Sequence, residues 1–390
     1  MRRAFIVVLD ACGCGALPDA GEYGDEGTNT LAHVADAVGG LKVPALERLG
    51  LGSIAPLRGV APAERPAVHG RLFPLGAGKD TTAGHWEMMG LPGPRFPTFP
   101  HGFPPEVIER LRRVTGRGVI CNAAVEGLRA IEQHGEQHLL TGDLIVYTSQ
   151  DSVLQIAAHT AVLPQEQLHA CCAAVRAALT GDHAVARVIA RPFEGEPGAF
   201  RRTLGRRDFA VAPPGRTYLD GLADAGVAVH AVGKVAQVFA GRGVDVDHPA
   251  PDNASAIAVL DRLADELDAG LVFANLVDTD QVYGHRKDVH GFHRALREID
   301  AAVARWTAAM RPGDLLCLSA DHGCDPAHPG TDHTREYAPL LALFAGHDGR
   351  RVDAPLASIG ASVLRWLAGR RAELPGEPFA PAPAVAAGRS

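Results

Sequence analysis

Short apolar runs that end in a carboxylate recur along the chain. FIVVLD ends at Asp10, LVFANLVD ends at Asp278, and DLLCLSAD ends at Asp321. Apolar runs of this length, bounded by turn residues, are typical of strands that are buried on both faces of a parallel sheet. The pattern therefore predicts three buried strands, each with an aspartate at its carboxyl end.

Helical periodicity occupies the stretches between these runs. Apolar residues recur at helical spacing over residues 253–268 and 291–310. Strands that alternate with helices predict an α/β layered sheet. In such sheets ligands gather beyond the carboxyl ends of the strands, so the three aspartates lie where a functional site is expected.

The middle of the chain differs from both ends. Proline-dense segments at 91–106 and 208–217 are interpreted as hinges, and between them residues 144–149 and 186–192 predict strands while 164–179 predict a helix. These elements suffice for a separate inserted domain. The predicted organisation is a core domain in two parts, residues 1–95 and 213–375. An inserted cap domain occupies residues 96–212, and a flexible tail occupies residues 376–390.

Bulk composition narrows the class of protein. The 390 residues are 46% hydrophobic and 21% charged, with a net charge of −7, which argues against nucleic acid or an anionic membrane as a partner. The apolar stretch before Asp10 is too short for a signal peptide. Seven cysteines at irregular spacings suit reduced, mostly buried thiols, so we expect a cytoplasmic location.

Residues of the types that can bind metals are concentrated near the predicted strand ends. They are Asp10, Asp278, Asp280, His285, Asp321, His322 and His333. Carboxylates mixed with imidazoles suit zinc, manganese or iron better than calcium. One site needs three or four side chains, so this set predicts two ions. A strand-end aspartate on its own is more often a helix cap, and spacing leaves the choice between Asp278 and Asp280 open.

The segment GKDTTAGHWEMMG, residues 78–90, is the other candidate for chemistry. Asp80 is positioned to cap a helix, and Thr81 would then lie at a helix N-terminus, where a phosphate is favoured. A threonine hydroxyl is a weak nucleophile that metal coordination can activate. Lysine is scarce, so Lys79 and Lys234 are candidate cations near a phosphate, with solvated surface lysines as the alternative.

Taken together, these segments make the chain resemble the bacterial phosphopentomutases of the alkaline phosphatase superfamily. The resemblance covers nearly the whole chain except the tail, and GKDTTAGHWE and ARPFEGEPG are its specific motifs. Its other motifs are VVLDACGCGALPDA, YTSQDSVLQIAAH, VDTDQVYGHRKD and ADHGCDPAHPGTDHTREYAPLL. It implies an alkaline-phosphatase-like core, with a central, mostly parallel sheet flanked by helices and an inserted smaller α/β cap domain.

The resemblance also implies roles for particular residues. One Mn²⁺ would be bound by Asp280, His285 and His333, which settles the choice against Asp278. The other Mn²⁺ would be bound by Asp10, Asp321, His322 and the catalytic Thr81. The substrate pocket would be lined by Asp151, Arg187, Arg202 and Lys234. Cys12, Cys14 and Cys324 depart from the usual pattern and are interpreted as small side chains in tight turns.

The implied activity interconverts the 1- and 5-phosphates of ribose or deoxyribose in nucleoside salvage and catabolism. It would proceed through phosphothreonine and a pentose 1,5-bisphosphate, with a sugar bisphosphate such as glucose 1,6-bisphosphate as activator. The expected partner is the pentose phosphate substrate, with no nucleic acid, membrane or protein partner. The alternatives are a phosphoglycerate mutase, a phosphatase or phosphodiesterase, and a metal-binding regulatory protein without chemistry.

Overall fold

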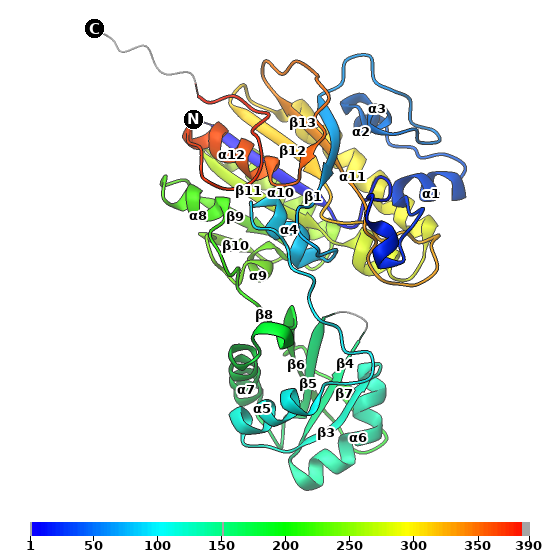
Figure 1. The fold of residues 1–390 in the computed structure, drawn as a ribbon, viewed down its shortest axis with the longest axis vertical. Coiled ribbons are helices and arrows are strands. Elements are labelled where there is room, and N and C mark those ends of the chain that lie inside the picture. The colour runs from blue at the N-terminus through cyan, green and yellow to red at the C-terminus, as the bar shows by residue number, and fades with distance from the viewer. Residues whose placement is uncertain (1, 150–151, 384–390) are drawn as a thin grey trace. The chain divides into compact units, whose positions relative to one another are not determined.

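The computed structural model describes residues 2–149 and 152–383, which form two compact units (Figure 1). The larger unit is built from Met1–Arg95 and Pro213–Ser390, and the smaller unit from Phe96–Ala212. The smaller unit is thus an insertion in the sequence of the larger one. The prolines at 91–104 carry no helix or strand, because proline removes a backbone donor and fixes φ.

The larger unit is organised around a mostly parallel eight-stranded sheet, as the sequence predicts. Its first five strands run parallel, whereas β13 is antiparallel to both of its neighbours. The order is β10 (Val246–His248), β9 (Val229–Val232), β11 (Gly270–Leu276), β1 (Arg3–Leu9), β12 (Asp314–Ser319), β13 (Ala338–Phe344), β2 (Val68–Phe73) and β14 (Ala354–Pro355).

The three strands predicted from the apolar runs lie side by side at the centre of this sheet. Strand β1 pairs with β11 and β12, with Leu9 opposite Leu276 and Val8 opposite Ser319. Every residue of the three strands is buried. Because all three are parallel and in register, the residues that follow them emerge at one edge of the sheet.

Helices cover both faces of the sheet (Figure 1). In α11 (Val289–Ala309) the buried Phe292, Leu296, Ile299 and Val303 recur at helical spacing, and this apolar face packs inward. On that side lie α1 (Thr30–Ala37), α2 (Pro44–Leu49), α3 (Leu51–Ile54) and α10 (Asn253–Glu266); on the other side lie α4 (Thr81–Met88), α8 (Tyr218–Ala223), α9 (Val235–Val238) and α12 (Ser358–Ala368). Helices α10 and α11 match the two predicted helices.

The smaller unit has a mixed six-stranded sheet with helices packed on it. Its strands are β3 (Val119–Ala124), β4 (Leu144–Thr148), β5 (Val153–His159), β6 (Arg187–Glu194), β7 (Arg201–Arg202) and β8 (Arg207–Ala210); its α-helices are α5 (Pro105–Thr115), α6 (Gly127–Thr141) and α7 (Gln165–Ala178). Two apolar clusters form its core, one that includes α5 and α7 and another that includes α6. The strands and the helix predicted in this region are all present.

Part of the segment that the sequence analysis assigns to a flexible tail contacts α12. Phe379 is buried, and its backbone N–H donates to Ser362 Oγ at 2.9 Å, while the N–H of Glu377 donates to Ser358 Oγ at 3.1 Å. The hydroxyl groups of α12 supply hydrogen-bond acceptors that no sequence periodicity indicates. Residues 384–390 lie outside the described residues.

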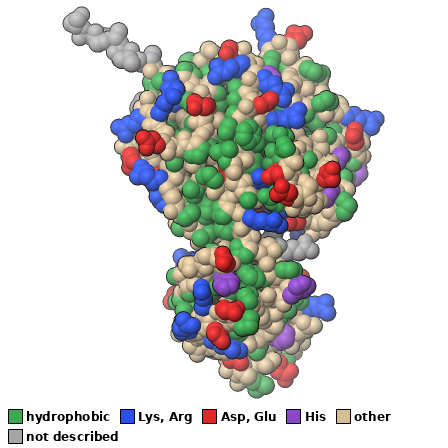
Figure 2. Space-filling view, in the orientation of Figure 1, with side chains coloured by type: hydrophobic (Ala, Val, Ile, Leu, Met, Phe, Trp, Pro, Cys, Tyr) green, Lys and Arg blue, Asp and Glu red, His purple; other side chains and the backbone are tan. Residues whose placement is uncertain are grey.

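The visible face of the structure carries side chains of both charges. Figure 2 shows acidic and basic side chains interspersed over the visible face of each unit. Within the described residues, no helix combines the length and the apolar character that crossing a bilayer requires.

Candidate metal centre

Asp10 begins the site at the end of β1. Its side chain is fully buried, and the amide Nδ2 of Asn275, on β11, donates to its Oδ2 at 3.0 Å. The hydroxyl of Thr279 donates to the Asp10 carbonyl at 2.6 Å. These two neighbours hold the aspartate between the ends of β1 and β11.

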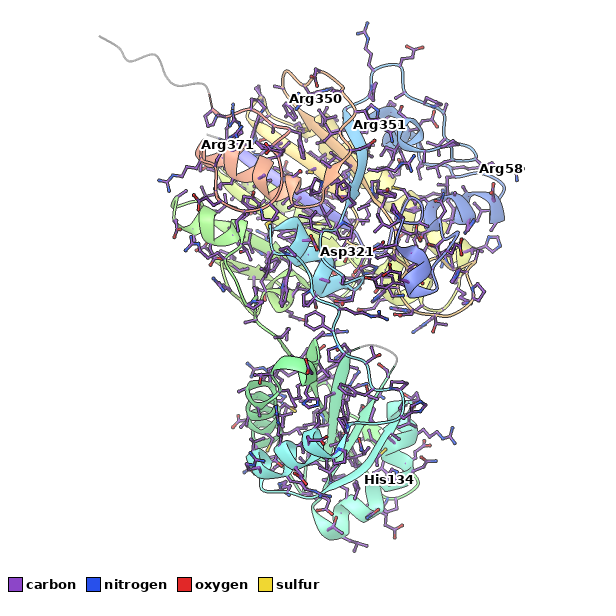
Figure 3. The ribbon with its side chains drawn as sticks, in the orientation of Figure 1. Arg58, His134, Asp321, Arg350, Arg351 and Arg371 are labelled. Carbon is purple, nitrogen blue, oxygen red and sulfur yellow. The ribbon has the colours of Figure 1, made fainter. Side chains whose placement is uncertain are left out.

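Asp321 follows β12 and lies beside Asp10. Asp321 lies against α4, and Figure 3 shows it well away from Arg350, which follows the oppositely directed β13. The N–H of Ala11 donates to Asp321 Oδ1 at 3.2 Å, and the Ala11 carbonyl accepts from the N–H of Cys324 at 3.2 Å. Ala11 has φ +64°, a left-handed conformation that is unfavourable for alanine. The tertiary contacts of this turn therefore stabilise a strained backbone next to the aspartates.

Asp280 lies on a single π-helical turn, η3 (Thr279–Gly284), that follows β11. Its Oδ1 is 3.3 Å from His285 Nε2 and 3.4 Å from His333 Nε2. Asp278 faces elsewhere, because its Oδ2 accepts from the N–H of Asn253 at the start of α10. The structure thus brings Asp280, not Asp278, to the two histidines.

His322 connects the two halves of the site. Its Nε2 lies 3.4 Å from Asp10 Oδ1, 3.4 Å from Asp321 Oδ2 and 3.3 Å from Thr81 Oγ1. Its ring centroid is 4.1 Å from that of His333. The six candidate ligands from aspartate and histidine and the Thr81 hydroxyl therefore share one site, although they are far apart in sequence.

The donor atoms fit divalent cations. The carboxylate atoms Asp10 Oδ1, Asp280 Oδ1 and Asp321 Oδ2 are buried without a hydrogen-bond partner, which is costly unless a cation compensates for it. The donor atoms form two groups, and within each group they all lie within 4.8 Å of one another. One group is Asp10, Asp321 and His322, and the other is Asp280, His322 and His333. Their mixed nitrogen and oxygen ligands suit first-row transition metals.

The electrostatics of the site favour positive charge. Burial raises the pKa of Asp10 well above its usual range, and the nearby Asp321 and Asp280 raise it further. Burial also lowers the pKa of His322 to about 4, which leaves its imidazole neutral near pH 7 with a lone pair for a cation. Asp280 is buried as well, but His333 and His285 keep its pKa below the usual value. The three buried carboxylates and the neutral imidazole of His322 thus offer negative charge and a nitrogen lone pair to divalent cations.

Thr81 is the first residue of α4, as the sequence predicts. The carboxylate of Asp80 caps the helix by accepting from the N–H groups of Thr82 and Ala83 at 2.9 and 3.1 Å. The N-terminal end of a helix carries partial positive charge. The local sequence thus places the Thr81 hydroxyl where a phosphate is stabilised, and the fold places it beside His322.

His85 is a site residue that the sequence analysis missed. It lies four residues after Thr81, its Nδ1 is 2.8 Å from the Thr81 carbonyl, and the same atom is 3.3 Å from Asp321 Oδ2. Its fully buried ring stacks on Phe273 with centroids 5.6 Å apart. The i, i+4 spacing from Thr81 is its only local signal. The sequence analysis also missed Asn275 and Thr279, which hold Asp10. Like Asp321 for His85, Asp10 is remote from them in sequence.

Gly84 permits α4 to approach Asp321 closely. A Cβ at this position would overlap the Asp321 backbone oxygen and lie only 2.7 Å from the Asp321 Cβ. We expect Gly84→Ala to push α4 from Asp321, lowering the free energy of unfolding by roughly 1–3 kcal/mol and weakening metal binding. The matched control is Gly21→Ala, where a Cβ meets nothing within 4 Å. Denaturant unfolding and metal titration of both variants would measure the difference; equal effects would contradict this reading of α4.

The two candidate lysines have different environments. Lys234 Nζ is 3.7 Å from Asp10 Oδ2, so it belongs to the site. Lys79 instead pairs with Asp25 at 3.0 Å and with Asp332 at 3.4 Å, because the loops that carry these residues close around it. The use of Lys79 as a cation near a phosphate therefore stays a prediction.

The remaining predicted residues lie elsewhere. Arg187 and Arg202 belong to the smaller unit, and Asp151 lies outside the described residues. The seven cysteines are free thiols. The Sγ atom of Cys324 lies within 4.8 Å of donor atoms of Asp280 and His285. Burial raises its pKa above the usual value, which disfavours the thiolate that would bind a metal.

Comparisons with known proteins identify the family of the chain. A sequence model described as the metalloenzyme superfamily matches residues 2–369. The phosphopentomutase of Caldanaerobacter subterraneus subsp. tengcongensis is 49% identical over 343 residues, 87% of each chain. That of Anaeromyxobacter dehalogenans (strain 2CP-C) is 48% identical over 380 residues, 96% of each chain. A solved phosphoglycerate mutase of Leishmania mexicana is far more distant, with 13% identity and a TM-score of 0.47 over 98% of this chain and 97% of that one. The chain therefore belongs to the phosphopentomutase family, within the metalloenzyme superfamily.

Proposed function

We propose that the chain interconverts the 1- and 5-phosphates of ribose and deoxyribose, with Thr81 as the residue that carries the phosphoryl group. The observation that supports this most is the position of Thr81, at the N-terminus of α4 and 3.3 Å from His322 Nε2, within the cluster of donor atoms. Family membership supports the same activity, since the relatives are named phosphopentomutases. A metal-binding protein without chemistry would have no need for a hydroxyl there.

The metal ligands proposed are those of the cluster. Asp280, His285 and His333 would hold one ion, and Asp10, Asp321, His322 and Thr81 the other; we assign both as manganese. When bound, the two ions would supply positive charge to the oxygens between which the phosphoryl group passes. The chain's own residues then orient the reaction. Asp80 caps α4, His85 holds the Thr81 turn against Asp321, and Lys234 adds a cation beside Asp10.

The proposed reaction consists of two transfers that are each other's reverse. Phosphorylated Thr81 gives its phosphoryl group to the free hydroxyl of a pentose phosphate, so the bond from phosphorus to Thr81 Oγ1 breaks and a bond to the sugar oxygen forms. The proton of the sugar hydroxyl ends on Thr81. The resulting pentose 1,5-bisphosphate then returns its other phosphoryl group to Thr81, which regenerates the phosphoenzyme and releases the isomer.

The smaller unit would act as a cap in this scheme. A phosphoenzyme that is open to water hydrolyses, so a mutase must exclude water during the transfer. We propose that Arg187, Arg202 and Asp151 of this unit, together with Lys234, line the pocket for the sugar phosphate. A sugar bisphosphate such as glucose 1,6-bisphosphate would charge Thr81 initially. The proposed setting is nucleoside salvage in the cytoplasm.

A product assay tests the proposed function. With Mn²⁺ and a catalytic amount of glucose 1,6-bisphosphate, we expect ribose 5-phosphate to be converted to ribose 1-phosphate with only a small fraction released as inorganic phosphate. Enzyme that has first been dephosphorylated should show a lag that the bisphosphate removes. Stoichiometric release of inorganic phosphate would instead identify a phosphatase, and turnover of phosphoglycerate but not pentose phosphate would identify the other mutase.

A further inference from the structure

Four arginines of the smaller unit lie on or next to the neighbouring strands β6, β7 and β8: Arg187, Arg191, Arg202 and Arg206, called here the arginine cluster. On β6, Arg187 pairs with Ala210 of β8, close to where the chain leaves the unit at Ala212. Guanidinium groups repel one another, so a cluster of this kind forms only where carboxylates or an anionic ligand compensate for the charge.

Asp208 is the carboxylate at the centre of this cluster. It lies on β8 opposite Ile189, and it accepts two hydrogen bonds from Arg206, from Nε to Oδ1 at 2.8 Å and from Nη2 to Oδ2 at 2.9 Å. Its Oδ2 is also 3.6 Å from Arg187 Nη1. Burial would raise the pKa of Asp208, but the hydrogen bonds and charges of Arg206 and Arg187 keep it below the usual value. Asp208 is therefore an anion that holds two guanidinium groups in place.

Exposure differs between the carboxylate and its arginines. The side chain of Asp208 is 9% exposed, whereas that of Arg187 is 33% exposed and that of Arg206 is 48% exposed. Solvent, or a ligand, thus reaches the cations but hardly reaches the group that holds them. This is the arrangement of a preorganised recognition site rather than of a surface ion pair.

Two further polar groups contact the cluster. Glu126 lies 3.1 Å from Arg202 Nη2, and Arg191 donates from Nε to the neutral Gln155 at 3.1 Å. Partly exposed guanidinium groups suit a phosphate monoester, which carries a charge of about −2 near neutral pH, because arginine recognises phosphate through paired N–H groups.

We propose that Asp208 is a positioning residue for substrate binding: it holds Arg187 and Arg206 in the orientation that receives the phosphate of a pentose phosphate. The inference rests on the proposed function and extends it to a residue that touches no substrate atom. Asp208 is itself repelled by the substrate, so its benefit must come from geometry. Without it, Arg187 and Arg206 lose their common anchor and must be ordered by the substrate at an entropic cost.

Kinetics of Asp208→Asn separate positioning from simple charge balance. The substitution keeps the shape of the side chain but removes its charge. If Asp208 only offset positive charge, the variant would bind the anionic substrate more tightly and KM would fall. If it positions the arginines, KM for ribose 5-phosphate should rise roughly tenfold while kcat stays within about threefold of wild type. An unchanged or lower KM would overturn the proposal.

Two further variants serve as controls for the positioning role of Asp208. Asp208→Glu, which keeps the charge, should recover part of the lost affinity. Glu194→Gln breaks an exposed pair in the same unit, with Arg201 at 2.9 Å, and should leave KM unchanged. If Asp208→Asn folds poorly, as its melting temperature would show, the charge-retaining Asp208→Glu carries the test: positioning predicts a measurable rise in KM, and charge balance predicts none.

A binding measurement makes the inference independent of turnover. In the full-length Thr81→Val protein with Mn²⁺, ribose 5-phosphate binding can be followed by calorimetry, and adding Asp208→Asn should weaken it roughly tenfold. If wild type shows no mutase activity, the proposed function fails, whatever the binding result. If wild type is active and Asp208→Asn leaves both KM and binding unchanged, only the role of Asp208 fails.

Discussion

We expect Thr81→Val to lose mutase turnover by roughly 10⁴-fold or more, because the substitution keeps the volume of the side chain and removes the oxygen that would carry the phosphoryl group. The hydroxyl lies at the start of α4, 3.3 Å from His322 Nε2. The measurement is the rate of conversion of ribose 5-phosphate in the presence of Mn²⁺ and glucose 1,6-bisphosphate. Incorporation of labelled phosphate into the protein should disappear in parallel.

The matched control for this experiment is the adjacent residue. Thr82 belongs to the same helix and is buried, and its backbone N–H donates to the Asp80 carboxylate. Thr82→Val should therefore keep turnover within a few-fold of wild type and retain phosphate incorporation. If Thr81→Val were to turn over at an appreciable rate, Thr81 would have no place in the mechanism.

Removing the metal should affect both activity and stability. Chelation is expected to reduce turnover to background, and Mn²⁺ should restore it. Without cations, the buried carboxylates of Asp10, Asp280 and Asp321 remain close together and uncompensated. A ligand at one hundred times its dissociation constant contributes about 2.7 kcal/mol per site, so two sites correspond to a fall in melting temperature of roughly 5–10 °C on chelation.

A comparison of two aspartates checks that the stability effect comes from this site. Asp10→Asn removes a candidate ligand and should shrink the chelator-induced shift, whereas Asp278→Asn, whose side chain faces Asn253, should keep it. The pH dependence has a definite sign. Burial raises the pKa of Asp10, and a proton there excludes a cation, so metal affinity should fall as the pH falls through that raised value. A chelator-insensitive melting temperature would contradict the metal assignment.

Much of the larger unit is a direct consequence of local pattern. Buried apolar runs predict β1, β11 and β12, and periodicity predicts α10 and α11, because the interior of a layered α/β sheet demands these patterns wherever the elements lie. The cap of α4 is likewise local, since Asp80 bonds N–H groups two and three residues ahead. The ligand residues are visible from their types and from their position after strands, although spacing alone left Asp278 and Asp280 undecided.

Contacts between remote segments were decided by the tertiary structure. Asn275 meets Asp10 and Cys324 comes near Asp280 because three parallel strands end in register, and register is a property of the sheet rather than of any one strand. His85 meets Asp321 because α4 packs against the end of β12. The burial of Phe379 against α12 and the pairing of Lys79 with Asp25 and Asp332 are likewise contacts that composition does not indicate.

The sequence by itself thus determined which elements form and which residue types stand at the ends of the central strands, since these follow from the local hydrophobic pattern. Only the tertiary structure decided which side chains meet. Asp208 can hold Arg187 because β8 pairs with β6, and Thr81 lies beside His322 because α4 packs where Gly84 allows close approach to Asp321. Both are distances between atoms of segments that are far apart along the chain, and only packing determines such distances.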